Sequence, residues 1–565
     1  MLSAPAVLFI AALGVWPLGA FLLGGFRTVS GDATLVHFRV LLSDGLFLQV
    51  AGRTALIALG VTAITLVLAY PLALTLMKAK GGAKAVLVTL VALPYLTSVL
   101  VRVYAWAALL SLEGPVNDVL VGLGVFDRPR LLGHSTAGTC IGMVHILCPI
   151  AVLTIWSQLE KIDRSGTLVA ATLGASRVRA FLTVFLPQSV PGLIGAGTIV
   201  YVLALGAYVI PAALGGTRGL LFAQLVVDQA TQLLDWEVSG AMGTLMLAVA
   251  AVPVLLLLAA GAVRRRFGTG AAVTPLQHLA ARTVLPVLDR VSGRVAGAVP
   301  VIAASLVLLF LLLPELVVLV FSFGPQRQVV LPPPFLTLAG YRTVLTDPGW
   351  IDPAQRSLVY ALTDAVIATL LGTMAAYGFA RGSARWARVG SFVLLAPLVL
   401  PEILTAISFF VFATKMQLAG TDAGIILGQA VGTVGLVVVV VGAVVRGVDI
   451  NLEHAAQACG ASRLRTVWDV VLPLILPGML VAFLYAFLHA FDNLVTPLFI
   501  AGTRSTITLR MFLSMQEQLT SAPAVIASLL IFALVAVLGG GLLASSVGRR
   551  RVPFLPAAAP GEVSA

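Results

Sequence analysis

Long apolar stretches, separated by short polar segments, occupy most of the chain. A helix needs about 20 consecutive apolar residues to cross a bilayer, and the sequence offers twelve such stretches, six in each half. In the first half they lie near residues 5–26, 47–77, 85–110, 136–157, 188–212 and 238–263. In the second half they lie near residues 297–322, 355–380, 389–412, 423–445, 474–500 and 523–548. The pattern predicts an all-α membrane protein with about 12 transmembrane helices, embedded in a lipid bilayer.

The twelve stretches divide into two repeats. We expect a first repeat at residues 1–266 and a second at 297–551, joined by a less hydrophobic cytoplasmic linker at 267–296. The Pro- and Ala-rich end, 552–565, is expected to be disordered. Because each repeat has six spans, both repeats have the same orientation. Such parallel repeats, related by an axis along the membrane normal, place a pathway at the interface between the halves.

One polar stretch interrupts each half at the same place, between its fourth and fifth spans. Residues 168–192 read LVAATLGASRVRAFLTVFLPQSVPG, and residues 454–478 read HAAQACGASRLRTVWDVVLPLILPG. Of the 23 positions from Ala170 to Gly192, 11 carry the same residue 286 positions later. Earlier pairs, Tyr70 with Tyr377 and Pro94 with Pro401, are 307 residues apart. The difference predicts 21 extra residues in the first half, within 111–134.

The distribution of charge gives the orientation. Only 10% of the residues are charged and the net charge is +12, whereas a soluble domain carries about 25% charged residues. Lysines and arginines gather in alternate connections, near residues 78–84, 161–179, 264–294, 381–388, 446–465 and 549–551. This positive-inside pattern places both termini and both copies of the polar stretch in the cytoplasm, with 5–26 as a retained first helix. This pattern explains the excess of lysine and arginine, so nucleic acid is not needed as a partner.

Each copy of the polar stretch predicts a short helix across the cytoplasmic mouth. An Ala-rich segment ends at Gly174 or Gly460, where glycine permits a left-handed turn. A basic segment follows, and a Leu-Pro pair begins the next span, since proline is tolerated in a first helical turn. The residues concerned are Ala170, Ala175, Ser176 and Pro187 in the first copy and Ala461, Ser462 and Pro473 in the second. The alternative is an ordinary loop kept similar by gene duplication.

These motifs resemble the EAA loop of the inner-membrane permeases of binding-protein-dependent ABC importers. The second copy fits that pattern at Ala455, Ala456 and Gly460, with His454 where glutamate is usual. The first copy fits at Ala170 and Gly174, with Leu-Val in place of Glu-Ala. The segments LPYLTSVLVRVYAWAALLSLEGPVNDVL and HAFDNLVTPLFIAGT are similar to the two permease types of spermidine/putrescine importers. The chain therefore looks like two such permeases fused into one.

The resemblance implies a type I ABC importer permease (MetI-like fold) in a bacterial inner membrane. Two ABC ATPase subunits would bind the cytoplasmic loops, and an extracytoplasmic solute-binding protein would dock outside. This chain would bind no cofactor and catalyse no reaction, because it contains no GxxxxGK[ST] phosphate loop; ATP and Mg²⁺ would bind the partner ATPases. The implied cargo is a polyamine, with ferric iron and thiamine as alternatives. A 12-helix ion-coupled secondary transporter is the rival class.

Ionisable residues inside spans are costly and often functional. Asp492, Glu402 and Arg102 are our candidates for a substrate path for a cationic cargo, and Arg102 can pair with one of the acids. Glu315 and Asp364 are further acids within spans, for which a place near a span end or packing on other helices is the favoured interpretation. The alternative for each is a structural ion pair or a position near the outer interface. His145 and His489 are expected to be buried, hydrogen-bonded histidines rather than proton relays.

Overall fold

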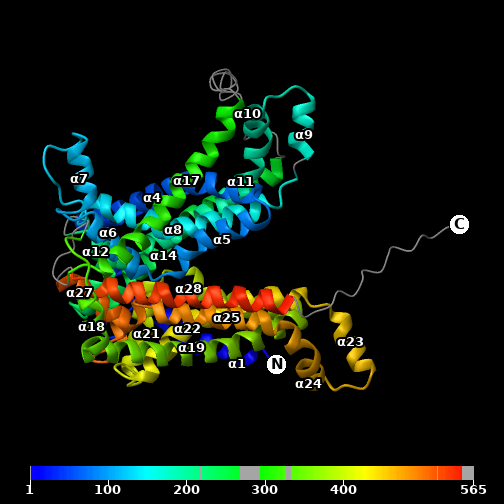
Figure 1. The fold of residues 1–565 in the computed structure, drawn as a ribbon. Coiled ribbons are helices and arrows are strands. Elements are labelled where there is room, and N and C mark those ends of the chain that lie inside the picture. The colour runs from blue at the N-terminus through cyan, green and yellow to red at the C-terminus, as the bar shows by residue number, and fades with distance from the viewer. Residues whose placement is uncertain are drawn as a thin grey trace.

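The computed structural model describes residues 2–28, 30–163, 165–216, 219–267, 293–325, 333–517 and 520–549. Most of the expected linker 267–296 and all of the expected disordered tail 552–565 lie outside these residues. The described part of the chain is helical almost throughout (Figure 1).

The first half begins with a helix that contains a π-helical turn, and it ends with a long apolar helix. Its elements are α1 (Ala4–Ile10), η1 (Ala11–Val15), α2 (Trp16–Gly24), α3 (Val36–Ser43), α4 (Gly45–Lys78), α5 (Gly81–Leu96), α6 (Val99–Leu109), α7 (Pro115–Gly122), α8 (Thr136–Leu159), α9 (Ser165–Thr172), α10 (Arg177–Ala180), η2 (Phe181–Phe185), α11 (Leu186–Leu205), α12 (Val209–Leu214), α13 (Phe222–Thr231) and α14 (Trp236–Phe267).

The second half repeats this order without a counterpart of α7. Its elements are α17 (Gly293–Ser322), α18 (Ala339–Thr346), α19 (Pro348–Arg381), α20 (Ala384–Val399), α21 (Glu402–Lys415), α22 (Asp422–Gly447), α23 (Ile450–Ala458), α24 (Arg463–Thr466), η4 (Val467–Val471), α25 (Leu472–Asp492), α26 (Val495–Ile500), α27 (Ile507–Glu517) and α28 (Ala522–Arg549).

Helix boundaries give the offset between the repeats. The helices α4, α5 and α6 begin 303 residues before α19, α20 and α21, whereas α8, α11 and α12 begin 286 residues before α22, α25 and α26. The first half therefore carries 17 extra residues between its third and fourth spans, around α7. The predicted place of the insertion is confirmed. The predicted offset of 307 and the length of 21 are wrong, because the Tyr70/Tyr377 and Pro94/Pro401 matches join positions that are not equivalent in the helices.

The expected all-α membrane architecture is confirmed. Within the described residues, nine helices are long and apolar enough to cross a membrane, and two bent pairs raise the number to 11. The remaining expected span, 523–548, corresponds to α28, whose described apolar part is Ala522–Ala533. The chain is thus a multi-pass membrane protein.

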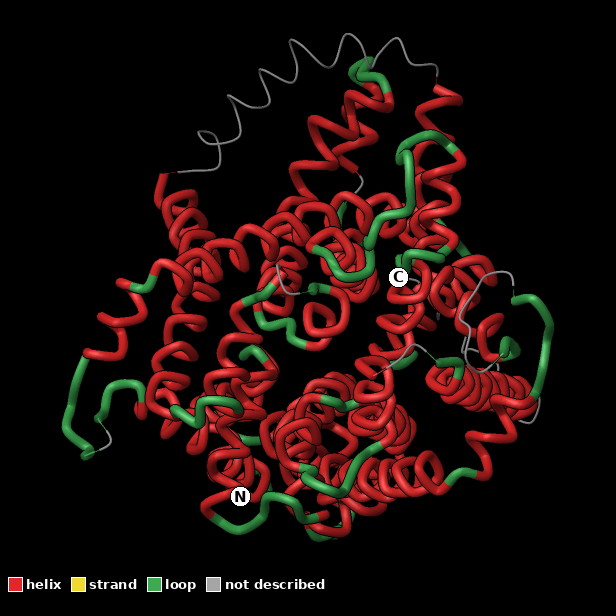
Figure 2. Tube along the Cα trace, turned by 90° about the vertical axis from the view of Figure 1, so that its left-hand side faces the viewer, coloured by secondary structure: helices red, strands yellow, loops and turns green. Residues whose placement is uncertain are grey.

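The first helix of each half packs against the other half. The α1–α2 helix lies along α19, α20 and α21, and α17 lies along α4, α5 and α6. Figure 1 shows α17 in the upper layer with α4 and α8, and α1 in the lower layer with α19 and α22. Ser3 illustrates the exchange, since its Oγ accepts a 2.8 Å hydrogen bond from the Trp386 indole. Figure 2, which looks along many of the helices, shows how closely the two groups adjoin. The repeats are therefore interlocked rather than separately packed.

The third predicted span of each half is broken. The α5–α6 pair bends by 87° and the α20–α21 pair by 102°. At the first break Thr97 has extended backbone dihedrals, and the Ser98 hydroxyl caps α6 by accepting from the Leu100 amide at 3.2 Å. At the second break Pro401 disfavours helical dihedrals at Leu400, which is extended. The expected spans at 85–110 and 389–412 are therefore each two helices joined by a sharp bend.

The fifth predicted spans begin earlier than the Leu-Pro pairs. Continuous helices cover Val178–Leu205 and Arg463–Asp492, so Pro187 and Pro473 lie inside them. A π-helical turn, η2 or η4, directly precedes each Leu-Pro pair. A proline lacks an N–H and its ring crowds the carbonyl four residues earlier, and the wider π-turn relieves this conflict. The helix η1 precedes Pro17 in the same way.

Candidate functional site

Two short helices, α9 and α23, stand at the same end of the molecule in Figure 1, the right-hand end, which is also where the chain begins. Both end in the same way. Gly174 has φ of +83° and Gly460 φ of +89°, and a side chain at either position would meet no atom within 4 Å. The predicted left-handed turn is therefore confirmed in both copies, and backbone conformation alone explains the glycines.

The hydrogen bonds around each glycine form a Schellman motif. In the first copy Ala175 N donates to Ala170 O at 3.0 Å, and Gly174 N donates to Ala171 O at 3.0 Å. In the second copy Ala461 N donates to Ala456 O at 3.0 Å, and Gly460 N donates to Gln457 O at 2.9 Å. The small alanines in the repeated motif thus supply the backbone groups that close each helix.

The serines begin the next helix. Ser176 Oγ accepts from Arg179 N at 3.1 Å, and Ser462 Oγ accepts from Arg465 N at 3.3 Å. A serine hydroxyl at this place is an N-cap, which satisfies an amide that the helix itself leaves free. Each loop is therefore a helix, a left-handed turn and a capped second helix.

The structure adds one residue of each loop that the sequence comparison did not single out. Asp163 Oδ1 accepts from Ser165 N at 2.9 Å and its Oδ2 from the Ser165 hydroxyl at 2.6 Å. Asp449 Oδ1 accepts from Asn451 N at 3.0 Å. These aspartates cap α9 and α23 and are 286 residues apart, so the repeat offset, extended upstream, would have found them. The Ser165 hydrogen bonds hold the pKa of the Asp163 carboxyl below its ordinary value.

The two helices differ in what they bury. α9 has no buried residue, and Leu168, Val169 and Leu173 are exposed, Leu173 at 82%. On α23 the exposed side chains include His454 and Ala455, whereas Glu453 is buried.

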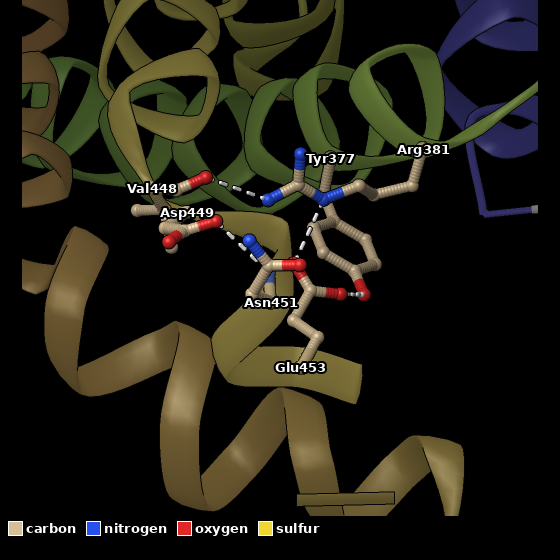
Figure 3. A network of polar contacts seen from close by, with 6 residues as sticks. All are labelled: Tyr377, Arg381, Val448, Asp449, Asn451 and Glu453. Carbon is tan, nitrogen blue, oxygen red and sulfur yellow. Dashed lines mark hydrogen bonds and ion pairs between the residues drawn. The ribbon is translucent and has the colours of Figure 1, made fainter. Parts of the chain in front are cut away.

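Glu453 anchors α23 to the end of α19 (Figure 3). Its Oε1 is 2.7 Å from Arg381 Nε in an ion pair with side-chain exposures of 17% for Arg381 and 6% for Glu453. Its Oε2 accepts from the Tyr377 hydroxyl at 2.9 Å, and Arg381 Nη2 donates to Val448 O at 3.0 Å. The acid beside His454 is therefore used within the chain. In the first copy Thr167 takes this place, and an ion pair between Lys84 and Glu160 links α5 to α8 instead.

A cavity of about 320 Å³ lies between the halves. It is lined by the breaks in both third spans and by the ends of α11 and α25. The polar side chains in its wall include Tyr95, Arg102, Glu402, Tyr485, His489, Asp492 and Asn493. The structure thus brings together Arg102, Glu402 and Asp492, the three residues predicted to line a path.

Asp492 and Arg102 both serve the break in the first half. Asp492 Oδ2 accepts from the amide of Val99, the first residue of α6, at 3.1 Å. Its Oδ1 is buried and has no hydrogen-bond partner among the described residues. Arg102 is 2% exposed, and its guanidinium donates to the carbonyls of Thr97 at 3.3 Å and Ser98 at 3.5 Å. No ion pair between Arg102 and a carboxylate falls within 4.0 Å among the described residues. Arg102 therefore forms no direct ion pair among the described residues, although Glu315 and Asp492 interact with it electrostatically. Its guanidinium donates to backbone carbonyls, and Asp492 caps a helix of the other half.

Glu402 opens on the cavity. It is the first residue of α21 and exposed, and its Oε1 accepts from Asn493 Nδ2 at 3.0 Å. Across the cavity the hydroxyls of Tyr95 and Tyr485 bond to each other and so join the halves. Glu315, on the exchanged helix α17, accepts from the Thr97 hydroxyl at 3.1 Å and does not line the cavity.

The histidines have different surroundings. His145 is fully buried, its Nε2 lies 3.1 Å from Leu311 O, and Trp106 and Phe310 pack on its ring. The expected buried, hydrogen-bonded histidine is confirmed there. His489 instead stands in the cavity wall, with Nδ1 3.5 Å from the Thr433 hydroxyl.

Known proteins resemble this chain in sequence. The profile of the family described as binding-protein-dependent transport system inner membrane component matches residues 368–551. The spermidine/putrescine transport system permease protein PotB of Escherichia coli (strain K12) is 32% identical over 208 residues, which cover 37% of this chain and 75% of PotB. The putrescine transport system permease protein PotI of the same strain is 28% identical over 204 residues, 35% of this chain and 72% of PotI.

Among solved structures, a bacterial ABC transporter that imports the acidic polysaccharide alginate aligns with 46% of this chain and 98% of its own, at 17% identity and a TM-score of 0.35. The family profile and the PotB similarity identify the chain. It belongs to the family of inner membrane components of binding-protein-dependent transport systems.

Proposed function

We propose that this chain is the whole permease of an ATP-driven importer, two permease units fused in one polypeptide, and that its cargo is a small cationic amine of the polyamine type. The observation that carries the proposal is the pair of matching loops. Two short helices with the same capped start and the same left-handed end project from one end of a membrane protein. A partner that binds both loops would be a symmetric protein or would be present as two subunits, one for each loop.

Two ATPase subunits fit these loops. The exposed Leu168 and Val169 of α9, with Leu173 directly after it, offer an apolar contact for one subunit. The exposed face of α23, including Ala455 and Leu452, offers the other. ATP and Mg²⁺ belong on those subunits, because the full sequence contains no GxxxxGK[ST] motif. Loop movement on ATP binding would reach the cavity through α11 and α25, which continue the loops without interruption.

The orientation follows from the loops. With α9 and α23 in the cytoplasm of a bacterial cell, the N-terminus is cytoplasmic, and the positive-inside pattern puts the C-terminus there as well. The insertion with α7 then faces outward, at the opposite end in Figure 1. That end is where an extracytoplasmic solute-binding protein would deliver the cargo.

The cavity supports a cationic cargo. Glu402 and Asp492 bring negative charge to its wall, while the charge of Arg102 is directed at backbone carbonyls. PotB and PotI carry spermidine and putrescine in their names, which favours a polyamine over ferric iron or thiamine.

Reconstitution tests the function. The chain is placed in proteoliposomes together with its ATPase and solute-binding protein, and uptake of labelled spermidine is measured with and without ATP at constant ion gradients. We expect uptake to require ATP. Uptake that continues without ATP would instead indicate an ion-coupled secondary transporter.

The coupling loops have their own test. Changing Gly174 and Gly460 together to valine should remove the ATPase from the purified complex, because valine resists positive φ. Gly31 is a matched control: it also has positive φ, of +92°, with open space around it, but lies in the connection between α2 and α3. The variant Gly31→Val should retain the ATPase. A double variant that retains both the ATPase and transport would refute the assignment of these loops.

A further inference from the structure

A polar cluster in the second half has no equivalent in the first. Asp364 of α19, Gln429 and Thr433 of α22 and His489 of α25 meet where these three helices pack together. At the corresponding positions of the first half the residues are Val61, Met143, Leu147 and Leu203. The packing of this fold therefore does not require the polar side chains.

The hydroxyl of Thr433 fixes the hydrogen-bond directions in the cluster. It lies 3.0 Å from the carbonyl oxygen of Gln429, one turn earlier in α22. A carbonyl only accepts, so the single hydroxyl proton of Thr433 is used there. His489 Nδ1, 3.5 Å from the same hydroxyl, must then donate to it. The imidazole is therefore the tautomer protonated at Nδ1.

Asp364 completes the coordination of Thr433. It is 0% exposed, lies beside the Thr433 hydroxyl, and neither carboxyl oxygen has a partner with good hydrogen-bond geometry among the described residues. An isolated carboxylate is prohibitively costly at such a site, so the group is a neutral acid. Gln429 Nε2 donates to Ala490 O at 3.1 Å and holds α22 against α25 beside His489.

The other ring nitrogen of His489, Nε2, has no hydrogen-bond partner among the described residues. His489 lines the cavity wall, and its Nε2 is neither hydrogen-bonded nor enclosed by the described side chains. With Nδ1 protonated, Nε2 carries a lone pair. Asp492 follows three residues later on the same face of α25 and also lines the cavity. A neutral acceptor and a carboxylate one turn apart suit an ammonium group, which has several N–H donors.

We propose that His489 is a specificity-determining residue that accepts an N–H hydrogen bond from the cargo through Nε2, with Thr433 and the protonated Asp364 as positioning residues. This inference rests on the proposed transport of cationic amines. It assigns the cargo class more narrowly: amines that retain N–H groups are selected over quaternary ammonium ions, which have no proton to donate. It also places this selection in the second half of the permease alone.

The test uses the full complex in proteoliposomes, with putrescine and its fully N-methylated derivative as probes. His489→Leu installs the residue that the first half has at this place. It should raise KM for putrescine about tenfold, the effect of losing one hydrogen bond to a charged group, and leave kcat and the methylated probe unaffected. Thr433→Val should raise KM by a similar factor. Asp364→Asn should stay close to the original protein, because an amide is also a neutral donor.

Nitrogen-15 NMR of the histidines reports which ring nitrogen carries the proton, which a packing defect alone would not change. The His489 signals, identified by their loss in His489→Leu, should show protonated Nδ1 and unprotonated Nε2, and Thr433→Val should abolish this preference. Thr65→Val is the matched control, since Thr65 is a buried, unpartnered hydroxyl of α4 far from the cluster. It should change neither KM nor the His489 signals.

Three results would overturn the inference alone: an unchanged KM for putrescine in His489→Leu, a His489 protonated at Nε2, or loss of selectivity in Asp364→Asn equal to that in His489→Leu. Failure of the unaltered complex to take up any amine would refute the proposed cargo, and the role of His489 with it.

Discussion

The ion pair between Arg381 and Glu453 makes a quantitative prediction about α23. The change is Arg381→Met, which keeps most of the side-chain volume and removes the charge. Two unit charges about 4 Å apart interact by about 4 kcal/mol at the effective dielectric constant of about 20 found near protein surfaces. Loss of one partner of a buried pair costs about 3–5 kcal/mol, because the other charge stays buried. Glu453 is only 6% exposed, but Arg381 is 17% exposed, so the expected cost is at the low end, about 3 kcal/mol.

This cost should appear as local opening of α23 rather than as global unfolding. Each 1.4 kcal/mol changes an equilibrium tenfold, so about 3 kcal/mol predicts amide exchange about 100-fold faster in α23. Hydrogen–deuterium exchange of the chain in lipid nanodiscs, read by mass spectrometry, measures this. The α9 helix is an internal control, because Thr167 stands at the place of Glu453 and α9 has no such ion pair.

A double-mutant cycle isolates the pair. Glu453→Gln keeps a hydrogen-bonding side chain for Tyr377 while removing the charge, and combining it with Arg381→Met removes both charges. We expect the double variant to exchange more slowly than Arg381→Met alone, with a coupling of about 2 kcal/mol. Exchange in α23 that rises less than about threefold, or that rises equally in α9, would refute the view that this pair anchors the second loop specifically.

Three further predictions address other elements. Gly460→Ala should destabilise the turn after α23 by about 1–2 kcal/mol, because residue 460 has a φ of +89°. Gly460→Asn should destabilise it less, and amide exchange measures both effects. Equal destabilisation by the two variants would contradict a purely conformational role for Gly460. Asn117→Ala should destabilise the α7 insertion by about 3 kcal/mol, since Asn117 makes three hydrogen bonds of 2.7–2.9 Å to Ser111 and Arg130, each contributing about 1 kcal/mol. Limited proteolysis should cut the insertion faster in this variant. Asp118→Ala, at the exposed neighbouring residue, is the control. Asp492→Asn should keep the cap on α6, because the amide oxygen also accepts from Val99, yet slow amine uptake; uptake at the original rate would remove the Asp492 charge from the path.

The membrane spans, the internal repeat and the ends of the two loop helices could be predicted from the sequence. These features depend on local properties: the length of an apolar run, the recurrence of residues at a fixed offset, and the backbone freedom of Gly174 and Gly460. The place of the insertion followed as well, although chance matches such as Tyr70 with Tyr377 gave the wrong length. The caps Asp163 and Asp449 were within reach of the sequence, since they keep the offset of 286 just upstream of the matched stretch.

Contacts between residues far apart in the chain were decided only by the tertiary structure. The exchange of α1 and α17 between the halves and the cap that Asp492 places on α6 join residues separated by hundreds of positions. No periodicity encodes such pairings. The same holds for Glu453, whose sequence position beside His454 suggests a partner protein and whose side chain instead turns inward to Arg381. The sequence determines which segments enter the membrane, because each apolar segment is driven out of water by its own hydrophobicity. The contacts of each buried charge are determined instead by how the helices pack against one another.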